Sequence, residues 1–301
     1  MEILKCITIK KQIKDKILVE DISFSIDKGD VIGLIGPNGA GKTTIIKLIL
    51  GLMRLSYGEV KINGYDIKKD FVKAIEKVGA IVENPDLYMY LSGYDNLQIT
   101  ANYYKDISKE RINEVIKIIG LEEKINDKVS TYSLGMKQRL AIGEAIINNP
   151  ELLILDEPTN GLDIEGIVEM RNLIKDLSEQ GIAILISSHN LTEIDNLCNR
   201  IIAIKNGKII TNDSIENFKS ESNIVSYELI LNSLENIEKI ILNYKYEILK
   251  DNTIKVYISK ENVSGLMQLL IQNNYQIYSV QESKMSSEEA FFKKVGDNKN
   301  D

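Results

Sequence analysis

Short apolar runs alternate with amphipathic stretches along most of the chain. Runs of four or five apolar residues are typical of strands buried on both faces, and three occur at 31–35, 152–155 and 182–186. Helical periodicity follows two of these runs, at 42–50 and 164–180, and a glycine ends each stretch. Strands that alternate with helices predict an α/β fold with a mainly parallel sheet and helices on both faces.

The pattern changes in the middle of the chain. Residues 84–149 are mostly helical and carry no strand signal, which predicts a helical subdomain within the α/β domain. A further helix is expected to begin at Asn190, with Glu193 completing a capping box. The segment 201–210 has the pattern of a hairpin that turns at Asn206–Gly207.

A polar linker is expected at 218–223, which divides the chain into a domain of residues 1–220 and a small α+β domain of residues 221–301. The predicted strands and helices of the second domain follow the order βαββαβ, at 227–231, 234–242, 246–249, 254–258, 263–273 and 277–280. That order suggests a ferredoxin-like regulatory fold or a domain that supports dimerisation or stability. A last helix is expected at 286–295, followed by a polar tail from Gly296.

Composition narrows the class of protein. The 301 residues are 44% apolar and 27% charged, which suits a globular chain, and no run reaches the ~18 apolar residues of a membrane span. The net charge of −7 argues against a nucleic-acid partner. Two cysteines, Cys6 and Cys198, form no metal-binding spacing and no disulfide framework, which favours a reducing compartment.

A glycine-rich loop lies between the first apolar run and the helix that follows it. Its sequence fits the phosphate-binding pattern G-x-x-x-x-G-K-[ST] and comprises Gly36, Pro37, Asn38, Gly39, Ala40, Gly41, Lys42, Thr43 and the adjoining Thr44. Backbone N–H groups of such a loop surround phosphates, and the positive end of the helix dipole adds to the attraction. Lys42 is expected to bridge the β- and γ-phosphates and Thr43 to bind Mg²⁺. The alternative is a chance glycine turn before a helix.

Polar residues follow the other two apolar runs. Asp156 ends one run, and its carboxylate is expected to hold the hydration shell of Mg²⁺. Glu157 lies one residue nearer the substrate water and is expected to orient or deprotonate it. His189, the sole histidine of the chain, follows the third run and is expected to contact the γ-phosphate. The alternatives are a helix-capping carboxylate pair and a solvent-exposed histidine.

The order and spacing of these motifs resemble the nucleotide-binding subunits of ABC transporters, which are P-loop NTPases. The distinguishing stretch is Tyr132–Arg139, which is similar to the family's signature sequence LSGGQ, and Asn160–Asp163 resembles its D-loop. Ser133 suits a helix N-cap, and Gly135 lets a phosphate approach the helix start. The resemblance implies that Ser133 and Gly135 face the nucleotide of a second subunit in a head-to-tail dimer, and that the D-loop, with Asp163 as a nucleotide-binding residue, links the two sites. For the signature residues the alternative is an ordinary capped helix.

The chain departs from the family pattern at three places. The signature keeps Ser133 and Gly135 but has other residues around them, a form that recurs among bacterial drug-export cassettes. Glu83 stands where the family has a glutamine, which resembles the lantibiotic and bacitracin self-protection group. That resemblance implies that Glu83 reaches Mg²⁺ or the water; otherwise it is a turn carboxylate before Pro85. No aromatic residue precedes Phe24, so the base of the nucleotide is expected to be selected weakly.

The resemblance implies a function as well as a fold. It implies an ATP- and Mg²⁺-dependent ATPase that dimerises, as a homo- or heterodimer, at the cytoplasmic face of the membrane and powers an integral-membrane permease that exports peptide antibiotics. The tyrosine-rich stretch 87–94 would contact the permease or pack within the helical subdomain. The alternatives are a soluble ABC ATPase that acts on ribosomes or nucleic acid, disfavoured by the single cassette and acidic charge, and the motor of an importer or lipid exporter.

Overall fold

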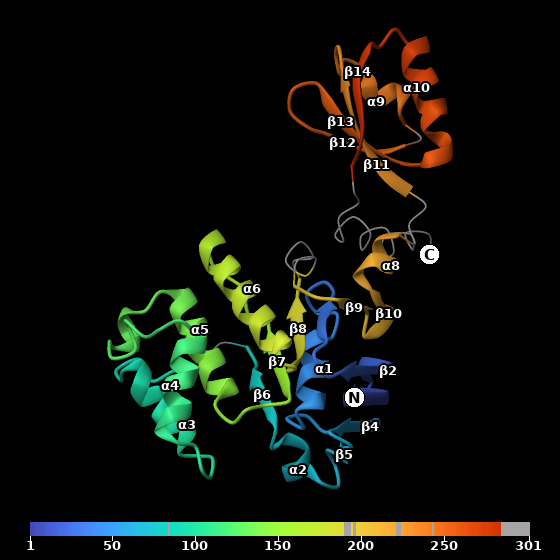
Figure 1. Ribbon diagram of the computed structural model, residues 1–301. Coiled ribbons are helices and arrows are strands. Elements are labelled where there is room, and N and C mark those ends of the chain that lie inside the picture. Colours follow the sequence, from blue (N-terminus) through green and yellow to red (C-terminus); the bar gives the residue numbers. More distant parts are fainter. Residues whose placement is uncertain (84, 190–193, 195–196, 221–223, 243, 284–301) are drawn as a thin grey trace. The chain divides into compact units, whose positions relative to one another are not determined.

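The computed structural model describes residues 1–83, 85–189, 194, 197–220, 224–242 and 244–283 (Figure 1). The chain divides into two compact units, Met1–Ile215 and Glu216–Asp301. Each unit has a hydrophobic core that shares no residue with the core of the other. No helix in the part of the chain that the structure describes is long and apolar enough to cross a bilayer.

A six-stranded sheet forms the centre of the first unit, in the order β10-β9-β3-β8-β7-β6. The strands are β3 (Val31–Ile35), β6 (Val78–Ile81), β7 (Leu152–Asp156), β8 (Ala183–Ser188), β9 (Arg200–Lys205) and β10 (Lys208–Ser214). All neighbours pair in parallel except β9 and β10, which form the predicted hairpin around Asn206–Gly207. Every residue of β3, β7 and β8 is buried, which explains the apolar runs that fill β3 and that lead up to Asp156 in β7 and Ser187 in β8. The predicted α/β class with a mainly parallel sheet is confirmed.

A second, antiparallel sheet packs in the same unit and was not predicted. It has the order β2-β1-β4-β5, with β1 (Glu2–Ile13), β2 (Lys16–Asp27), β4 (Tyr57–Ile62) and β5 (Tyr65–Asp66). Register shifts along β1 break the alternation of inward and outward side chains that would announce a strand. The alternation of Ile22, Phe24 and Ile26 in β2 is regular, and all three are buried, so this signal could have revealed the sheet.

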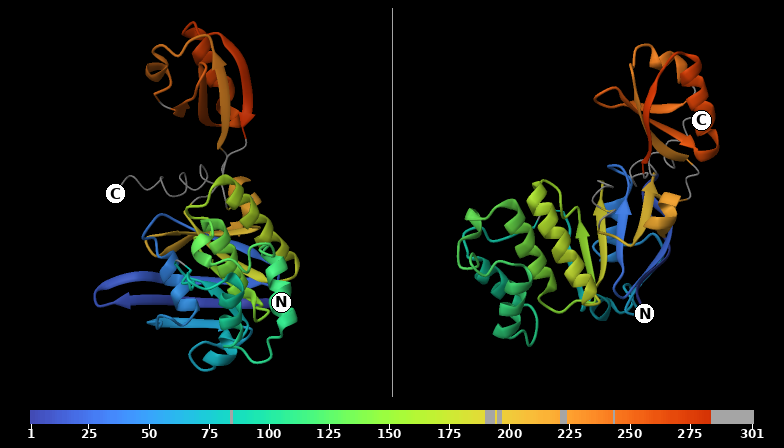
Figure 2. Two further views of the ribbon diagram at one scale, coloured as in Figure 1. Left: turned by 90° about the vertical axis from the view of Figure 1, so that its left-hand side faces the viewer. Right: turned by 45° about the horizontal axis from the view of Figure 1, so that its top comes forward.

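Helices complete the first unit. They are α1 (Lys42–Ile49), α2 (Phe71–Ile75), α3 (Gly93–Ala101), α4 (Lys109–Ile118), α5 (Leu134–Ile146) and α6 (Ile164–Glu179), with a 3₁₀ turn, η1, at Val129–Thr131. Residues 85–149 contain helices and no strand, as the sequence predicts. Figure 2 shows α3, α4 and α5 grouped at one side of the central sheet, where α5 packs against β6. Serine side chains cap the N-termini of these three helices.

The second unit is an antiparallel sheet with helices in the order βαββαβ. Its elements are β11 (Ile224–Leu231), α9 (Ile237–Ile240), β12 (Lys245–Ile248), β13 (Thr253–Ser259), η2 (Lys260–Asn262), α10 (Val263–Gln272) and β14 (Ile277–Ser283). The strand order β12-β13-β11-β14 is that of a ferredoxin-like fold. The predicted order is therefore correct, although the first helix is shorter than the predicted 234–242.

One boundary prediction was wrong. Residues 218–220 do not form a linker, because they end the helix α8 (Ile215–Ser220). Ile215 and Phe218 are buried and lie three residues apart, on one face of that helix. Burial of these two apolar side chains stabilises the helix. The helix start expected at Asn190, residues 221–223, the helix at 286–295 and the tail from Gly296 lie outside the described residues.

Glu144 is a partly buried acid between α5 and α3 that bears on stability. The hydroxyl of Thr100 donates to Glu144 Oε1 over 3.1 Å. Burial raises the pKa of the Glu144 carboxyl from 4.5 to about 7. The folded chain therefore favours the protonated acid. The stability that the protonated Glu144 side chain gives the fold is fully present below pH 4.5 and is lost as the pH rises through 7.

Glu144→Gln should consequently raise the Tm at pH 8 by several degrees, on the order of 2 kcal/mol, because the amide is never ionised. At pH 4.5, the carboxyl's ordinary pKa, the difference should nearly vanish. Thermal unfolding monitored by circular dichroism at both pH values measures the effect. Glu179→Gln, at an exposed position of α6, is the control and should change neither value. An equal Tm gain at both pH values would contradict the assignment.

Candidate functional site

Three buried strands of the central sheet end at one edge, and the predicted phosphate-binding residues follow them. The glycine-rich loop follows β3, Asp156 ends β7 and Glu157 follows it, and His189 follows β8. Since β3, β8 and β7 are parallel neighbours, these segments must meet at the carboxyl edge of the sheet. The fold thus gathers residues that are more than 140 positions apart in the sequence.

The glycine-rich loop is a tight turn that leads into α1. The N–H of Ala40 donates to the carbonyl of Pro37 over 3.0 Å. Gly39 and Gly41 have φ values of +81° and +112°, which side chains with a Cβ rarely adopt. Gly41 is the N-cap of α1, so Lys42, Thr43 and Thr44 occupy its first turn and their N–H groups have no helical partner. The loop therefore presents amide donors at a helix start.

Lys42 lies inside this loop. Its side chain is only 6% exposed, and Nζ donates to the carbonyl of Gly36 over 2.8 Å. The same ammonium lies 3.4 Å from Glu157 Oε1. A buried cation is stable only with such partners, and the loop carbonyl and the carboxylate supply them.

Asp156 connects the loop to the neighbouring strands. It is 5% exposed, and the hydroxyl of Thr43 donates to Asp156 Oδ2 over 3.0 Å. The hydroxyl of Ser187 donates to Asp156 Oδ1. Asp156 and Ser187 are register partners in the parallel pair of β7 and β8, so they lie side by side. Sequence reasoning missed Ser187; its one signal was a serine at the end of an otherwise apolar run.

Glu157 has a left-handed backbone, with φ of +53°, which is unusual for a residue with a side chain. Its N–H donates to Ser187 Oγ over 2.9 Å, which holds this conformation in place. Glu157 Oε2 lies 2.7 Å from His189 Nδ1. His189 is half exposed, whereas Glu157 is 25% exposed. Lys42, Glu157 and His189 therefore form one chain of polar contacts.

Glu83 makes a different contact from the one expected. Glu83 Oε1 lies 2.7 Å from the ammonium of Lys47 on α1, and this hydrogen-bonded lysine lowers the pKa of the Glu83 carboxyl. The carboxylate is 64% exposed. Glu83 thus follows β6 at the same sheet edge as the other strand ends, where its carboxylate pairs with Lys47 on α1.

Ser133, Gly135 and Asp163 line a separate groove. Ser133 caps α5 by accepting from the N–H of Met136 over 3.2 Å, and Asp163 caps α6 by accepting from the N–H of Gly166 over 2.9 Å. The groove has a volume of about 460 Å³, and none of its lining residues belongs to the glycine-rich loop. It therefore presents two helix N-termini to whatever occupies it.

A glycine-rich loop between a buried strand and a helix, with a lysine and a hydroxyl at the helix start and a carboxylate beside them, defines the P-loop NTPases. A model of the family described as ABC transporter matches residues 19–160.

Relatives match over most of the chain. The uncharacterized ABC transporter ATP-binding protein YhcH of Bacillus subtilis (strain 168) is 43% identical over 99% of this chain and 97% of its own length. The bacitracin transport ATP-binding protein BcrA of Bacillus licheniformis is 36% identical over 98% and 97%. The lantibiotic transport ATP-binding protein SrtF of Streptococcus pyogenes is 41% identical over 69% and 89%. The chain belongs to the ATP-binding proteins of ABC transporters.

Solved structures agree with this assignment. The ATP-binding subunit of an ABC transporter superposes with a TM-score of 0.66 at 29% identity and covers 73% of this chain and 92% of its own. The family binds ATP and hydrolyses it to power transport, so the protein is an ATPase subunit of a transporter. The resemblance that the sequence motifs indicate is thereby confirmed.

Proposed function

We propose that the protein binds and hydrolyses MgATP as a dimer and powers a separate membrane permease that exports peptide antibiotics of the bacitracin or lantibiotic kind. One observation carries the proposal. The phosphate loop and its carboxylates form one cluster, whereas Ser133, Gly135 and Asp163 line a separate groove with two helix N-termini. A second copy or a related subunit supplies the missing half of each site.

The residues at the loop fit a magnesium–nucleotide complex. Thr43 and Asp156 offer hydroxyl and carboxylate oxygens 3.0 Å apart, and oxygen ligands are those that Mg²⁺ prefers. These two residues would hold the ion, which would neutralise phosphate charge when bound. The loop amides of Gly36–Thr44 bind the phosphates, and Lys42 exchanges its carbonyl partner for the β- and γ-phosphate oxygens.

Glu157 is the residue proposed to prepare the water that attacks the γ-phosphate. Its carboxylate accepts a proton from the water or orients it, because it lies next to the lysine that binds the phosphate. His189 contacts the carboxylate 2.7 Å away and turns it toward the reacting position. Glu83 is proposed to join the site when the nucleotide binds, by leaving Lys47.

The proposed cargo rests on the relatives. BcrA is a bacitracin transport protein and SrtF a lantibiotic transport protein by name, and BcrA matches both units of this chain. Glu83 in place of the family's glutamine points to the same group. The proposed location is the cytoplasmic face of the membrane, where the permease presents its cytoplasmic loops.

The proposed permease contact is the stretch 87–94. Leu87 is buried in the helical subdomain, but Tyr88, Met89 and Tyr90 are exposed, and the two tyrosine rings stack edge to face. Exposed aromatic and methionine side chains are common at protein interfaces. The buried Leu87 therefore supports packing within the helical subdomain, whereas the exposed Tyr88 and Tyr90 support contact with the permease.

Capture of the partner tests the proposed function. Tagged Glu157→Gln protein, loaded with MgATP in gently solubilised cells of its source, should retain a multi-span membrane protein identified by mass spectrometry. Lys42→Ala, which should not bind the nucleotide, is the matched control and should retain less. Ribosomal or DNA-bound partners without a membrane protein would end the transport proposal and leave only the ATPase.

Weak selection of the nucleotide base is a further expectation. Ile13 ends β1, and Ile17 is the second residue of β2, next to Leu18, whose carbonyl lies beside Gly41. Both isoleucines are nearly half exposed and offer an aliphatic surface without an aromatic ring. We therefore expect GTP to be hydrolysed with a kcat/KM within about tenfold of that for ATP.

A competition assay with the two nucleotides measures this ratio. Ile13→Tyr should lower the KM for both nucleotides by up to about tenfold, because a ring adds ~0.5–1.5 kcal/mol of stacking. Ile271→Tyr, at an exposed position of α10 in the second unit, is the control. Strict selectivity of the unaltered protein for ATP would overturn the expectation.

A further inference from the structure

The helices α5 and α6 lie close together near their N-termini. A Cβ on Gly135 would lie 4.0 Å from the Cα of Gly166 and 3.9 Å from the side chain of Leu162. The caps of the two helices, Ser133 and Asp163, lie at the same groove. The spacing of the two helices therefore fixes the shape of the groove that the proposed function assigns to the second subunit's nucleotide.

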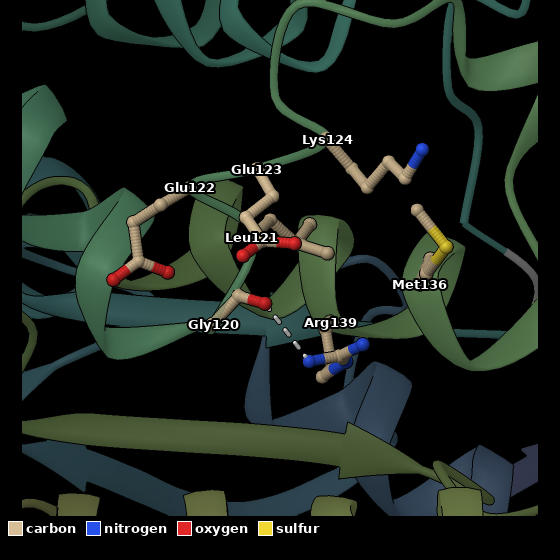
Figure 3. Close-up of a pocket in the computed structure, with 7 residues that line it drawn as sticks. All are labelled: Gly120, Leu121, Glu122, Glu123, Lys124, Met136 and Arg139. Carbon is tan, nitrogen blue, oxygen red and sulfur yellow. Dashed lines mark hydrogen bonds between the residues drawn. The ribbon is translucent and has the colours of Figure 1, made fainter.

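Arg139 lies one turn further along α5, on the same face as Gly135. Its Nη2 lies 3.5 Å from Glu169 Oε2 on α6, and its side chain is 17% exposed. Its Nη1 donates to the carbonyls of Ile119 and Gly120, each over 3.2 Å. Figure 3 shows the bond to Gly120. One guanidinium thus connects three helices.

The carbonyls of Ile119 and Gly120 lie just past the C-terminus of α4, where the helix dipole is negative, so they attract a cation. Glu169 supplies a full negative charge on the other side. A planar guanidinium reaches both at once because its N–H groups point in fixed directions. A lysine ammonium is a single point charge and has no such fork.

We propose that Arg139, paired with Glu169, is a positioning residue that holds α5 against α6, so that Ser133 and Gly135 meet the nucleotide bound to the second subunit. The proposal rests on the proposed head-to-tail dimer. Amides at a helix start act only over hydrogen-bond distance, so a small shift of α5 removes their contact with a phosphate. Arg139 and Glu169 also line this groove, and the proposed role of Arg139 is the bridge between the two helices.

The first test is Arg139→Lys, which keeps the charge. The rate of ATP hydrolysis should fall about tenfold or more, while binding of a fluorescent ATP analogue to the variant's own loop stays within twofold. Arg111→Lys is the matched control: Arg111 is equally buried, and it bonds the carbonyls of Ile146 and Ile147 at the far end of α5. It should keep the wild-type rate even where its Tm falls. An equal loss in both variants would reduce Arg139 to a general structural role.

The second test separates the two subunits. Arg139→Lys is mixed in equal amounts with Lys42→Ala, which lacks its own nucleotide site. If Arg139 acts on the partner's nucleotide, half of the randomly paired dimers contain one intact site, and about a quarter of the wild-type rate returns. If Arg139 serves its own subunit, the mixture stays below about a tenth of that rate.

A third mixture separates this inference from the proposed function. Ser133→Arg places a bulky side chain in the groove, and its mixture with Lys42→Ala should also regain about a quarter of the rate. If this mixture regains activity and the Arg139→Lys mixture does not, the role of Arg139 is overturned and the head-to-tail dimer stands. If neither mixture regains activity, the dimer itself is overturned.

Discussion

Replacing Glu157 by Gln should lower the rate of ATP hydrolysis by about three orders of magnitude while MgATP still binds. The amide is nearly the same size and can keep the contacts to Lys42 and His189, which lie 3.4 Å and 2.7 Å from the carboxylate. It cannot take a proton from water. The phosphate loop, Thr43 and Asp156 are unchanged, so affinity for the nucleotide should stay within a few fold.

Phosphate release gives the rate of hydrolysis, and a binding assay on the same preparation gives the affinity for MgATP. Glu151→Gln is the matched control, because Glu151 precedes the opposite end of the same strand β7 and is exposed. It should change neither quantity. If Glu157→Gln loses affinity as much as rate, the carboxylate binds substrate instead of preparing water. If the rate is unchanged, a group other than Glu157 prepares the attacking water.

Lys42→Ala should abolish measurable nucleotide binding, with a rise in Kd of at least about 100-fold. The ammonium is buried and already lies in the loop, so the nucleotide gains a charge-assisted contact without ordering a free side chain. Alanine also leaves the phosphates without that cation in a partly dehydrated site.

The shift of Tm on addition of MgATP measures this binding. The unaltered protein should be stabilised in proportion to the logarithm of nucleotide concentration, and Lys42→Ala should show no shift. Lys117→Ala, at an exposed position in the last turn of α4, is the control. A full shift in Lys42→Ala would mean that the loop amides alone hold the phosphates.

The central fold was predictable because its signals are local. Strands buried on both faces need uninterrupted apolar runs, and β3, β7 and β8 have them. The hairpin at Asn206–Gly207 and the βαββαβ order were visible for the same reason. The strand β1 could not be predicted, because its bulges interrupt the alternation of buried and exposed residues that identifies a half-buried strand. The helix α8 was also missed, because its two buried residues, Ile215 and Phe218, give little periodicity.

The candidate site also contains residues that the sequence could predict and contacts that it could not. The loop from Gly36 to Thr43 is contiguous in sequence, so its chemistry can be predicted from the pattern alone. Ser187 reaches Asp156 only because β8 lies beside β7, and Arg139 reaches Glu169 only because α5 crosses α6. Lys47 meets Glu83 because α1 passes the end of β6. Such contacts depend on topology, which local periodicity does not encode.

The strand order also has a consequence for synthesis of the chain on the ribosome. β3 carries the phosphate loop and is among the first strands to be made, yet its two neighbours are β8 and β9. Its hydrogen bonds therefore wait until Ser188 on one side and Ala203 on the other have been added. During that interval Val31–Ile35 is an unpaired apolar segment, which is where a nascent chain is open to wrong pairing or to a chaperone. The candidate nucleotide site is thus completed late, not long before the second unit is made.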